Sequence, residues 1–434
     1  MTKRRLGASY RKLLVSTAIS NVGDGMSTIA YPWLASAITR NPILISLVVL
    51  VQRLPWLIFT LPAGVITDRV DRKRAMVFAD FIRFGLTLVV ALAVLSKQSG
   101  LPGPDELAGV RGTETGLYIV LLLATLLLGT AEVLRDNCGQ TFMPSIVEVD
   151  DLEVANGRMW SVESIANTFV GPPLGSLLLL AAFALPFFVD AASFFAAAAL
   201  VTSIPGTFRA ERPEGHARAP WRSELAEGFR WLWANELLRS MAIILGLMNM
   251  ASTLSGSVLV LFAQEILKIG PLLFTIMGFG FAAGFAIGGN VAPWMSKRLG
   301  SGTCLAITLG SGAVTSSVIA VSSWWPVVMV MFALFALLGA SWNVITVSLR
   351  QAIIPPHLLG RVNSVYRFFA WGMMPIGAAL GGVTVTVVSH LADRRIALRS
   401  AYFLDAAIYV CLFIVGRRKL TTAKLEAARA MAPV

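Results

Sequence analysis

The chain has few charged side chains for its length. Only 14% of its 434 residues are Asp, Glu, Lys or Arg, whereas 56% are hydrophobic. Soluble domains carry about 25% charged residues. This composition therefore excludes an ordinary soluble protein.

Cysteine and histidine are also scarce, with three residues of each. The cysteines are scattered and have neither the spacing of a metal site nor that of a disulfide framework. The sequence contains no nucleophile triad and no phosphate-cradling loop. We therefore expect no cofactor, no metal, no direct use of ATP and no enzymatic activity.

Long apolar runs are what the sequence has in abundance. Roughly 20 apolar residues cross the hydrocarbon core of a bilayer, and such runs must be helical because lipid offers no partner to backbone groups. The sequence predicts an all-α polytopic membrane protein with twelve transmembrane helices. The expected spans lie near residues 13–37, 43–66, 75–96, 116–136, 157–180, 183–204, 237–263, 271–294, 302–321, 325–348, 362–388 and 398–416.

The net charge of +12 comes from Lys and Arg residues that gather in alternate loops. This distribution follows the positive-inside rule and forms no groove-sized basic patch, so it argues against nucleic-acid binding. We expect a multi-pass protein of the cell membrane with both termini in the cytoplasm.

The two halves of the chain repeat each other. The repeated motifs occur in the same order: Gln140-Thr-Phe-Met-Pro144 with Gln351-Ala-Ile-Ile-Pro355, Val154-Ala-Asn156 with Arg361-Val-Asn363, Gly171-Pro-Pro-Leu-Gly175 with Gly377-Ala-Ala-Leu-Gly381, and Phe188-Val-Asp190-Ala-Ala with Phe403-Leu-Asp405-Ala-Ala. A duplicated six-helix unit is typical of transporters that work by alternating access. The predicted division is a six-helix bundle over 1–204, a linker over 205–236, a pseudo-symmetric six-helix bundle over 237–416 and a cytoplasmic tail over 417–434.

The linker contains an amphipathic segment. One helical face of this segment carries Trp221, Leu225, Phe229, Leu232 and Trp233. We expect a helix that lies in the cytoplasmic membrane interface and joins the two halves.

The loop between the second and third spans is densely charged. Residues 68–74, Asp-Arg-Val-Asp-Arg-Lys-Arg, hold six charges in seven positions, and Gly64 precedes them. Together with the span count and the repeat, this loop resembles the signature of the major facilitator superfamily. A degenerate copy, Ser296-Lys-Arg-Leu-Gly300, stands in the second half. Asp71 departs from the family pattern, which usually has glycine there.

The resemblance implies a cytoplasmic gate that favours the outward-open state. Gly64 would let the second span approach the eleventh, Asp68 would lie at the N-terminus of that span, and Arg72 would bridge to acidic groups. Arg69 and Arg83 belong to the same predicted gate. Alternatively, these charges only set the topology.

Within the superfamily the chain is most similar to twelve-span, proton-driven exporters of drugs and siderophores. Gly171, Pro172 and Gly175 resemble the core of the antiporter motif, in which proline and glycine give a kink and close packing where the two halves meet. Asn167 stands where the wider motif has a further glycine. The motif favours export over import.

Charged residues inside the expected spans are candidates for proton coupling, because a charge in the bilayer is costly. Asp24 in the first span and Arg53 in the second lie at matching depth and are expected to pair, either as a coupling switch or as a permanent structural ion pair. Glu132, Arg135 and Glu163 are expected to form an inner polar cluster with Asp80, Arg83 and Asp136. A structural gating network is the alternative.

Asp190 and Asp405 occupy symmetry-related places, which indicates a packing or capping role inherited from the duplicated unit. The second half has few charges, so we expect it to supply the substrate cavity. The residues predicted to line that cavity are Asn249, Trp342, Asn343, Tyr366 and Trp371. Gly280, Gly284 and Gly288 predict close helix packing.

The sequence thus predicts a secondary active transporter that exports small amphiphilic compounds in exchange for protons, as a monomer in the lipid bilayer. A proton symporter or a flippase for lipid-like substrates is the alternative within transport. A non-transporting membrane scaffold or receptor is the alternative outside it.

Overall fold

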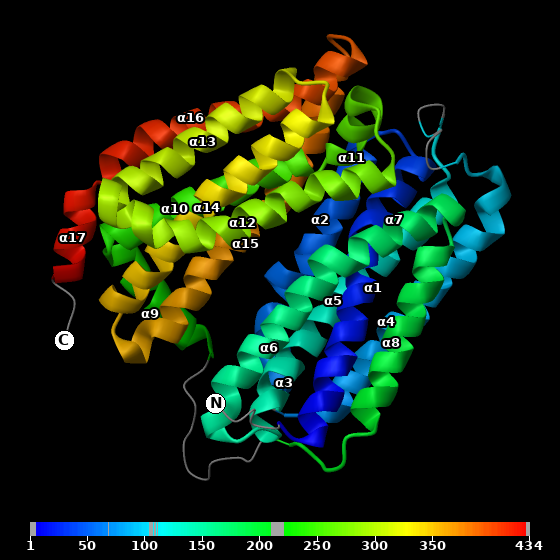
Figure 1. The fold of residues 1–434 in the computed structure, drawn as a ribbon, viewed down its shortest axis with the longest axis horizontal. Helices are drawn as coiled ribbons and strands as arrows, with labels where there is room; N and C mark the ends of the chain where they lie inside the picture. Colours follow the sequence, from blue (N-terminus) through cyan, green and yellow to red (C-terminus); the bar gives the residue numbers. More distant parts are fainter. Residues whose placement is uncertain are drawn as a thin grey trace. The chain divides into compact units, whose positions relative to one another are not determined.

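The computed structural model describes residues 6–67, 69–103, 107, 110, 112–209 and 221–430, and these fold almost entirely into helices. The chain divides into two compact units (Figure 1). The first unit comprises residues 1–213 and 269–275, and the second comprises residues 214–268 and 276–434. The sequence-based domain limits stay a prediction.

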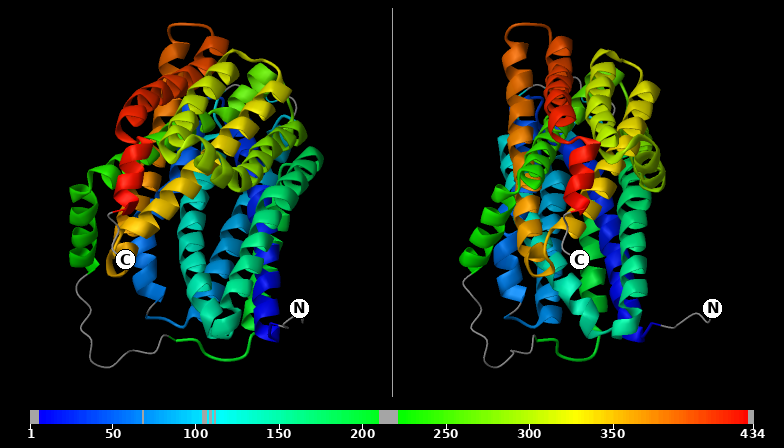
Figure 2. Two further views of the ribbon diagram at one scale, coloured as in Figure 1. Left: turned by 60° about the vertical axis from the view of Figure 1, so that its left-hand side comes forward. Right: turned by 90° about the vertical axis from the view of Figure 1, so that its left-hand side faces the viewer.

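The first unit is a bundle in which α8 packs between α1 and α4, and α5 packs on α2 and α4. Figure 2 shows its long helices running alongside one another. Its helices are α1 (Ala8–Ile38), α2 (Pro42–Ile58), α3 (Thr60–Thr67), α4 (Arg72–Lys97), α5 (Thr115–Phe142), α6 (Leu152–Ser164), α7 (Gly171–Ala181) and α8 (Leu185–Thr202).

Two of the expected spans in the first unit are interrupted. The second span breaks at Phe59 into α2 and α3, shortly after Pro55. The fifth span changes into a π-helical turn over Ile165–Val170 and resumes as α7, which has Pro172 in its first turn. Proline removes a backbone donor, and π-helical turns are frequent at functional sites. The motif therefore begins a new helix directly after a π-helical turn, and the predicted kink stays a prediction.

The second unit pairs α10 with α15 and α13 with α16. Its helices are α9 (Trp221–Ala234), α10 (Glu236–Gly256), α11 (Leu259–Phe262), α12 (Pro271–Leu299), α13 (Ser301–Val321), α14 (Trp325–Ile353), α15 (Pro356–Ser389), α16 (Arg394–Lys419) and α17 (Thr422–Ala430). The first residues of α12 count with the first unit.

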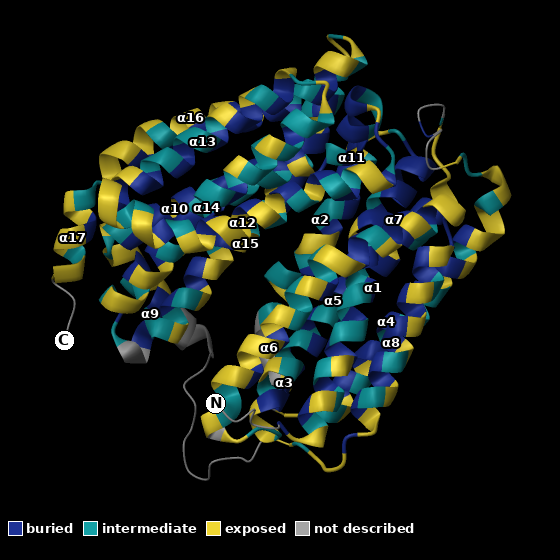
Figure 3. Ribbon diagram, viewed as in Figure 1, coloured by how far each residue is buried: buried dark blue, intermediate teal, exposed yellow. Residues whose placement is uncertain are grey.

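Within the described residues, ten helical stretches are long and apolar enough to cross a membrane. The first two expected spans are absent from this set. One is α1, which carries Asn21 and Asp24, and the other is α2, which has only 17 residues. Many large apolar side chains on the outer faces are exposed, as lipid-facing residues are (Figure 3). The predicted fold class, an all-α multi-pass membrane protein, is confirmed.

Small residues repeat the same packing in both units. A Cβ atom on Gly171 would lie 2.5 Å from the carbonyl oxygen of Val22 on α1, and one on Gly175 would lie 2.8 Å from Met26. In the second unit, Gly377 and Gly381 approach α10 in the same way. Both copies of the motif therefore hold a helix against the first span of their own unit.

The glycines of α12 also behave as predicted. Cβ atoms on Gly280, Gly284 and Gly288 would lie 2.0 to 2.5 Å from carbonyl oxygens of α14. This stripe is a close helix contact, which only residues without a side chain permit.

The predicted amphipathic helix is present as α9, and part of its apolar face is covered by protein. Leu232 is buried in the core of the second unit, and Gly228 lies against the backbone of Arg361 at the start of α15. Phe229 stacks on Trp233, with the ring centroids 5.2 Å apart. The apolar face of α9 is thus shared between a protein contact with α15 and exposed rings, since Phe229 and Trp233 are each 41% exposed. Its location in the membrane interface stays a prediction, and the side chains of Trp221 and Leu225 lie outside the described residues.

Candidate functional site

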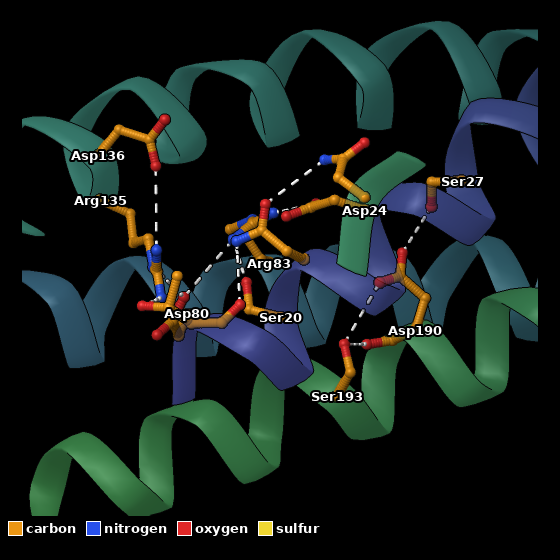
Figure 4. Close-up of polar contacts among 12 residues, drawn as sticks. Ser20, Asp24, Ser27, Asp80, Arg83, Arg135, Asp136, Asp190 and Ser193 are labelled. Carbon is orange, nitrogen blue, oxygen red and sulfur yellow. Dashed lines mark hydrogen bonds and ion pairs between the residues drawn. The ribbon is translucent and has the colours of Figure 1, made fainter. Parts of the chain in front are cut away.

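Five ionisable residues in the first unit form a continuous series of ion pairs, which we call the charge chain (Figure 4). Arg83 on α4 pairs with Asp24 on α1, and its Nη1 lies 3.6 Å from Oδ1 of Asp80. The same Asp80 oxygen lies 3.5 Å from Nε of Arg135 on α5. Nη1 of Arg135 in turn lies 3.9 Å from Oδ1 of Asp136.

The charge chain is buried in the middle and accessible at its ends. The side chains of Asp80, Arg83 and Arg135 are 0%, 3% and 6% exposed, respectively. Those of Asp24 and Asp136 are 26% and 39% exposed. Burying several charges is tolerated only when they neutralise one another. A change of charge on Asp24 or Asp136 therefore alters the net charge that the buried residues Asp80, Arg83 and Arg135 have to neutralise.

The two accessible ends border two different pockets. The Asp24 pocket has a volume of about 240 Å³ and is also lined by Arg53, Arg83, Glu132 and Asp190. The Asp136 pocket has a volume of about 470 Å³ and is lined by Arg135, Glu163 and polar residues of α1 and α6. The five residues predicted to couple protons all border one of these pockets.

The predicted partner of Asp24 was wrong. Asp24 pairs with Arg83 of α4, while Arg53 lines the same pocket without forming that ion pair. The reason is helix packing: α1 lies against α8, and α8 also packs on α4, which brings Arg83 to Asp24. Matching depth in two consecutive spans does not determine which faces meet.

The role of Arg83 in the cytoplasmic gate stays a prediction, and the structure shows where its side chain lies. Arg83 lies eleven residues into α4 (83 − 72 = 11), roughly 16 Å along the axis at 1.5 Å per residue. Its guanidinium stacks over the ring of Phe194 on α8, 3.9 Å from the centroid, and donates to Oγ of Ser20. Arg83 therefore belongs to the charge chain.

Asp190 and Asp405 make matching hydrogen bonds in the two units. Oγ of Ser27 on α1 donates to Asp190 over 2.7 Å, and Oγ of Ser255 on α10 donates to Asp405 over 2.8 Å. This agreement is the inherited packing role that the repeat predicts. Asp190 nevertheless also lines the Asp24 pocket.

The densely charged loop is tied to the segment that follows α8. Asp71 caps α4 by accepting from the backbone N–H of Arg74, and it also accepts from the N–H of Phe208 over 2.7 Å. Burial alone would raise the pKa of Asp71, but these two hydrogen bonds and the positive charges of Arg74 and Lys73 together lower that pKa. Asp71 is therefore an N-cap residue that also anchors a neighbouring segment.

The other predicted gate residues have mixed outcomes. The contacts described for Arg72 are with neutral acceptors at the end of α5, the carbonyl of Thr141 and Oγ of Ser145, so the expected bridge to acidic groups is wrong within the described residues. Arg69 is exposed. Asp68 lies outside the described residues, and the contacts of Asp68 and Gly64 with the eleventh span stay predictions.

The predicted substrate-cavity residues do not form one surface. Trp342 and Tyr366 are each 1% exposed and belong to the core of the second unit, so their assignment to an open cavity is wrong. Asn249 donates to the carbonyl of Ala370 on α15. Asn343 and Trp371 are exposed. Apolar side chains in a span can face the core, lipid or a cavity, and the sequence does not distinguish these environments.

Several contributors to the site were missed from the sequence. Ser20 and Ser27 lie four residues before and three after Asp24, so helical spacing places them on its face and could have revealed them. Phe194 and Phe208 carried no such signal, because their contacts are with distant segments.

Residues 13–371 match the family model described as Major Facilitator Superfamily. The chain belongs to this superfamily. It is a transporter for a small-molecule substrate and not an enzyme.

Curated relatives cover nearly the whole chain. The chain is 27% identical to the multidrug efflux pump Tap of Mycobacterium tuberculosis, over 96% of this chain and 94% of Tap. It is 26% identical to the enterobactin exporter EntS of Escherichia coli, over 97% of this chain and 95% of EntS.

Solved superfamily structures share the fold. A bacterial homologue of the iron transporter ferroportin in the inward-facing state matches with a TM-score of 0.73 at 16% identity, covering 96% of this chain and all of that one. The nucleoside transporter NupG matches with a TM-score of 0.62 at 13% identity, covering 95% of this chain and 99% of NupG. At these identities the likeness concerns the fold alone.

Proposed function

We propose that this transporter exports small amphiphilic compounds in exchange for protons, and that the charge chain couples the two movements. The observation that carries the proposal is the arrangement of Asp24, Arg83 and Asp80: one buried arginine is shared between an accessible carboxylate and a buried one. The direction and the class of cargo follow the relatives, which are named as a multidrug efflux pump and an enterobactin exporter.

The coupling step is a competition for Arg83. When Asp24 is ionised, it shares the positive charge of Arg83 with Asp80. A proton on Asp24 cancels one negative charge, and Arg83 is then held by Asp80 alone. A state of the transporter in which Arg83 no longer reaches Asp24 becomes less costly, so protonation shifts the conformational equilibrium.

Glu132, Arg135 and Glu163 are part of the same proposed coupling mechanism. Glu132 lines the pocket of Asp24, whereas Arg135 and Glu163 line the pocket of Asp136 at the other end of the charge chain. We assign Asp24 the role of proton acceptor and the arginines the role of transmitting its change of charge to Asp136.

The same proposal includes the orientation and the gate. The protein is a monomer in the cell membrane, and both of its termini lie in the cytoplasm. Residues 64–74 form a gate on the cytoplasmic side. The anchoring of this loop by Asp71 supports a gating role, since the loop is joined to the segment after α8.

The test is proton flux driven by substrate. Purified protein is reconstituted in proteoliposomes that contain a pH-sensitive dye, and amphiphilic drugs and a catecholate siderophore are added one at a time. An exchanger moves protons against the substrate, and Asp24→Asn loses at least 90% of that flux, because it cannot take up a proton. Asp393→Asn changes an exposed carboxylate before α16 and serves as the matched control.

Three outcomes contradict parts of the proposal. Proton movement in the same direction as the substrate identifies a symporter, and substrate movement without protons identifies a facilitator or flippase. Undiminished proton exchange in Asp24→Asn removes Asp24 from the mechanism.

A further inference from the structure

The second unit contains a cavity of its own, with a volume of about 120 Å³. It lies among α10, α11, α12, α13, α14 and α16, and we call it the Asp405 cavity. Its lining combines one carboxylate with aromatic rings and hydroxyl groups. The residues that matter here are Tyr402, Asp405, Ser316, Phe281, Phe332 and Phe335.

The carboxylate of Asp405 is only half satisfied. The residue is 4% exposed, and its Oδ2 accepts from Ser255 over 2.8 Å and from Ser316 over 3.0 Å. Its Oδ1 is buried and has no hydrogen-bond partner, and neither has the hydroxyl group of Tyr402. A buried carboxylate oxygen without a hydrogen-bond partner is costly, and an ionisable residue in a membrane span is a candidate functional residue.

A comparison of the two repeated units shows that the counterpart of Arg83 in the second unit is a glycine. The third span of each unit is α4 in the first and α13 in the second, and their N-cap residues are Asp71 and Gly300. Arg83 is the twelfth residue after Asp71 (83 − 71 = 12), and Gly312 is the twelfth after Gly300 (312 − 300 = 12). In the first unit, Arg83 stacks on Phe194 and lines the same pocket as Asp190. In the second unit, Tyr409 fills the place of a side chain, since a Cβ on Gly312 would lie 2.3 Å from its ring.

The two units therefore differ in one respect that concerns charge. Both keep the serine-bound carboxylate, and in the first unit an arginine, Arg83, lines the same pocket as that carboxylate. No Lys or Arg is among the described residues that line the Asp405 cavity. The second unit thus presents an anionic group, surrounded by aromatic rings, that lacks an internal cation.

We propose that the Asp405 cavity binds the ammonium group of the exported compound, as a protonated amine or a quaternary ammonium. A carboxylate together with aromatic faces is the chemistry that recognises organic cations. The volume is comparable to that of engineered cavities of about 150 Å³ that hold benzene, so an ammonium headgroup fits and a whole drug does not. This inference rests on the proposed function and names the class of its cargo.

Binding is measured without a proton gradient, so that the result is independent of coupling. The full-length protein is placed in nanodiscs of zwitterionic lipid, and equilibrium dialysis measures benzyltrimethylammonium and its uncharged carbon isostere, neopentylbenzene. We expect Asp405→Asn to weaken binding of the cation at least tenfold and to leave binding of the isostere unchanged. Phe281→Leu, which removes a half-exposed ring, should weaken binding of the cation several-fold.

The control variant is again Asp393→Asn, at an exposed site outside the cavity, which should bind both probes as the unmodified protein does. Equal binding of the two probes to the unmodified protein overturns the inference, and so does unchanged binding of the cation in both Asp405→Asn and Phe281→Leu. If Asp405→Asn does not fold, Phe281→Leu alone tests the site. Loss of proton exchange in Asp24→Asn with intact cation binding separates this site from the coupling proposal.

Discussion

At the scale of single residues, the first unit depends on how its buried charges are shared. Asp80 is fully buried, and both of its oxygens lack hydrogen-bond partners, so its neutralisation comes from the ion pairs with Arg83 and Arg135. Breaking such a pair leaves a buried charge without compensation, which costs more than the pair itself contributes. Arg83 is therefore a structural as well as a functional residue.

We expect Arg83→Gln to destabilise the protein by about 3 to 5 kcal/mol, because Asp80 and Asp24 lose a common partner. The double variant Asp80→Asn with Arg83→Gln should be less destabilised than the sum of its single variants. Thermal unfolding in detergent measures both effects, with the exposed Arg158→Gln as control. Additive losses would show that the two residues do not interact.

Asp71 gives the stability of the loop a dependence on pH. Its pKa is lowered in the folded protein, so its ionised form stabilises the fold above the unfolded-state pKa of about 3.9, and this contribution is lost as the pH falls through the lowered value. We expect Asp71→Ala to cost about 1 kcal/mol at pH 7, and the difference from the unmodified protein to shrink at pH 3. A constant difference in melting temperature across this range would contradict the role of the charge.

At the scale of helices, close packing of α7 on α1 places the Asp24 pocket. Gly171 and Gly175 allow α7 to approach the part of α1 that carries Asp24. The sequence predicted close packing at this motif, since small residues let two helices approach each other. It did not reveal that the contact is with α1, because spacing along one helix contains no information about its partner.

Two glycines in the same span give a matched pair of substitutions. We expect Gly171→Ala to destabilise the protein and reduce transport, because its Cβ would collide with the backbone of α1. Gly157→Ala should be neutral or stabilising by up to about 1 kcal/mol, since no atom lies within 4 Å of its Cβ position and alanine favours a helix. The melting temperature of each variant measures its stability, and proton exchange in proteoliposomes measures its transport. Equal effects of the two substitutions would refute the packing argument.

At the scale of the whole molecule, the repeat explains both what the units share and where they diverge. The serine bonds to Asp190 and Asp405 and the glycine contacts on α1 and α10 are the same in both units. The charges near these carboxylates are different: Arg83 lines the pocket of Asp190, whereas no Lys or Arg is among the described residues that line the Asp405 cavity. We infer a division of labour, with protons handled in the first unit and a cation received in the second.

The sequence by itself determined the membrane class, the helices and the repeat. Each of these is a one-dimensional property: a long apolar run has to be a helix in lipid, and two copies of a motif can be recognised without coordinates. Only the tertiary structure decided that Asp24 meets Arg83 rather than Arg53, and that Trp342 and Tyr366 are core residues. It also decided that Asp405 faces a cavity whose described lining contains no Lys or Arg. These outcomes depend on how each helix is rotated against its neighbours, and in a largely apolar chain many rotations satisfy the same sequence pattern.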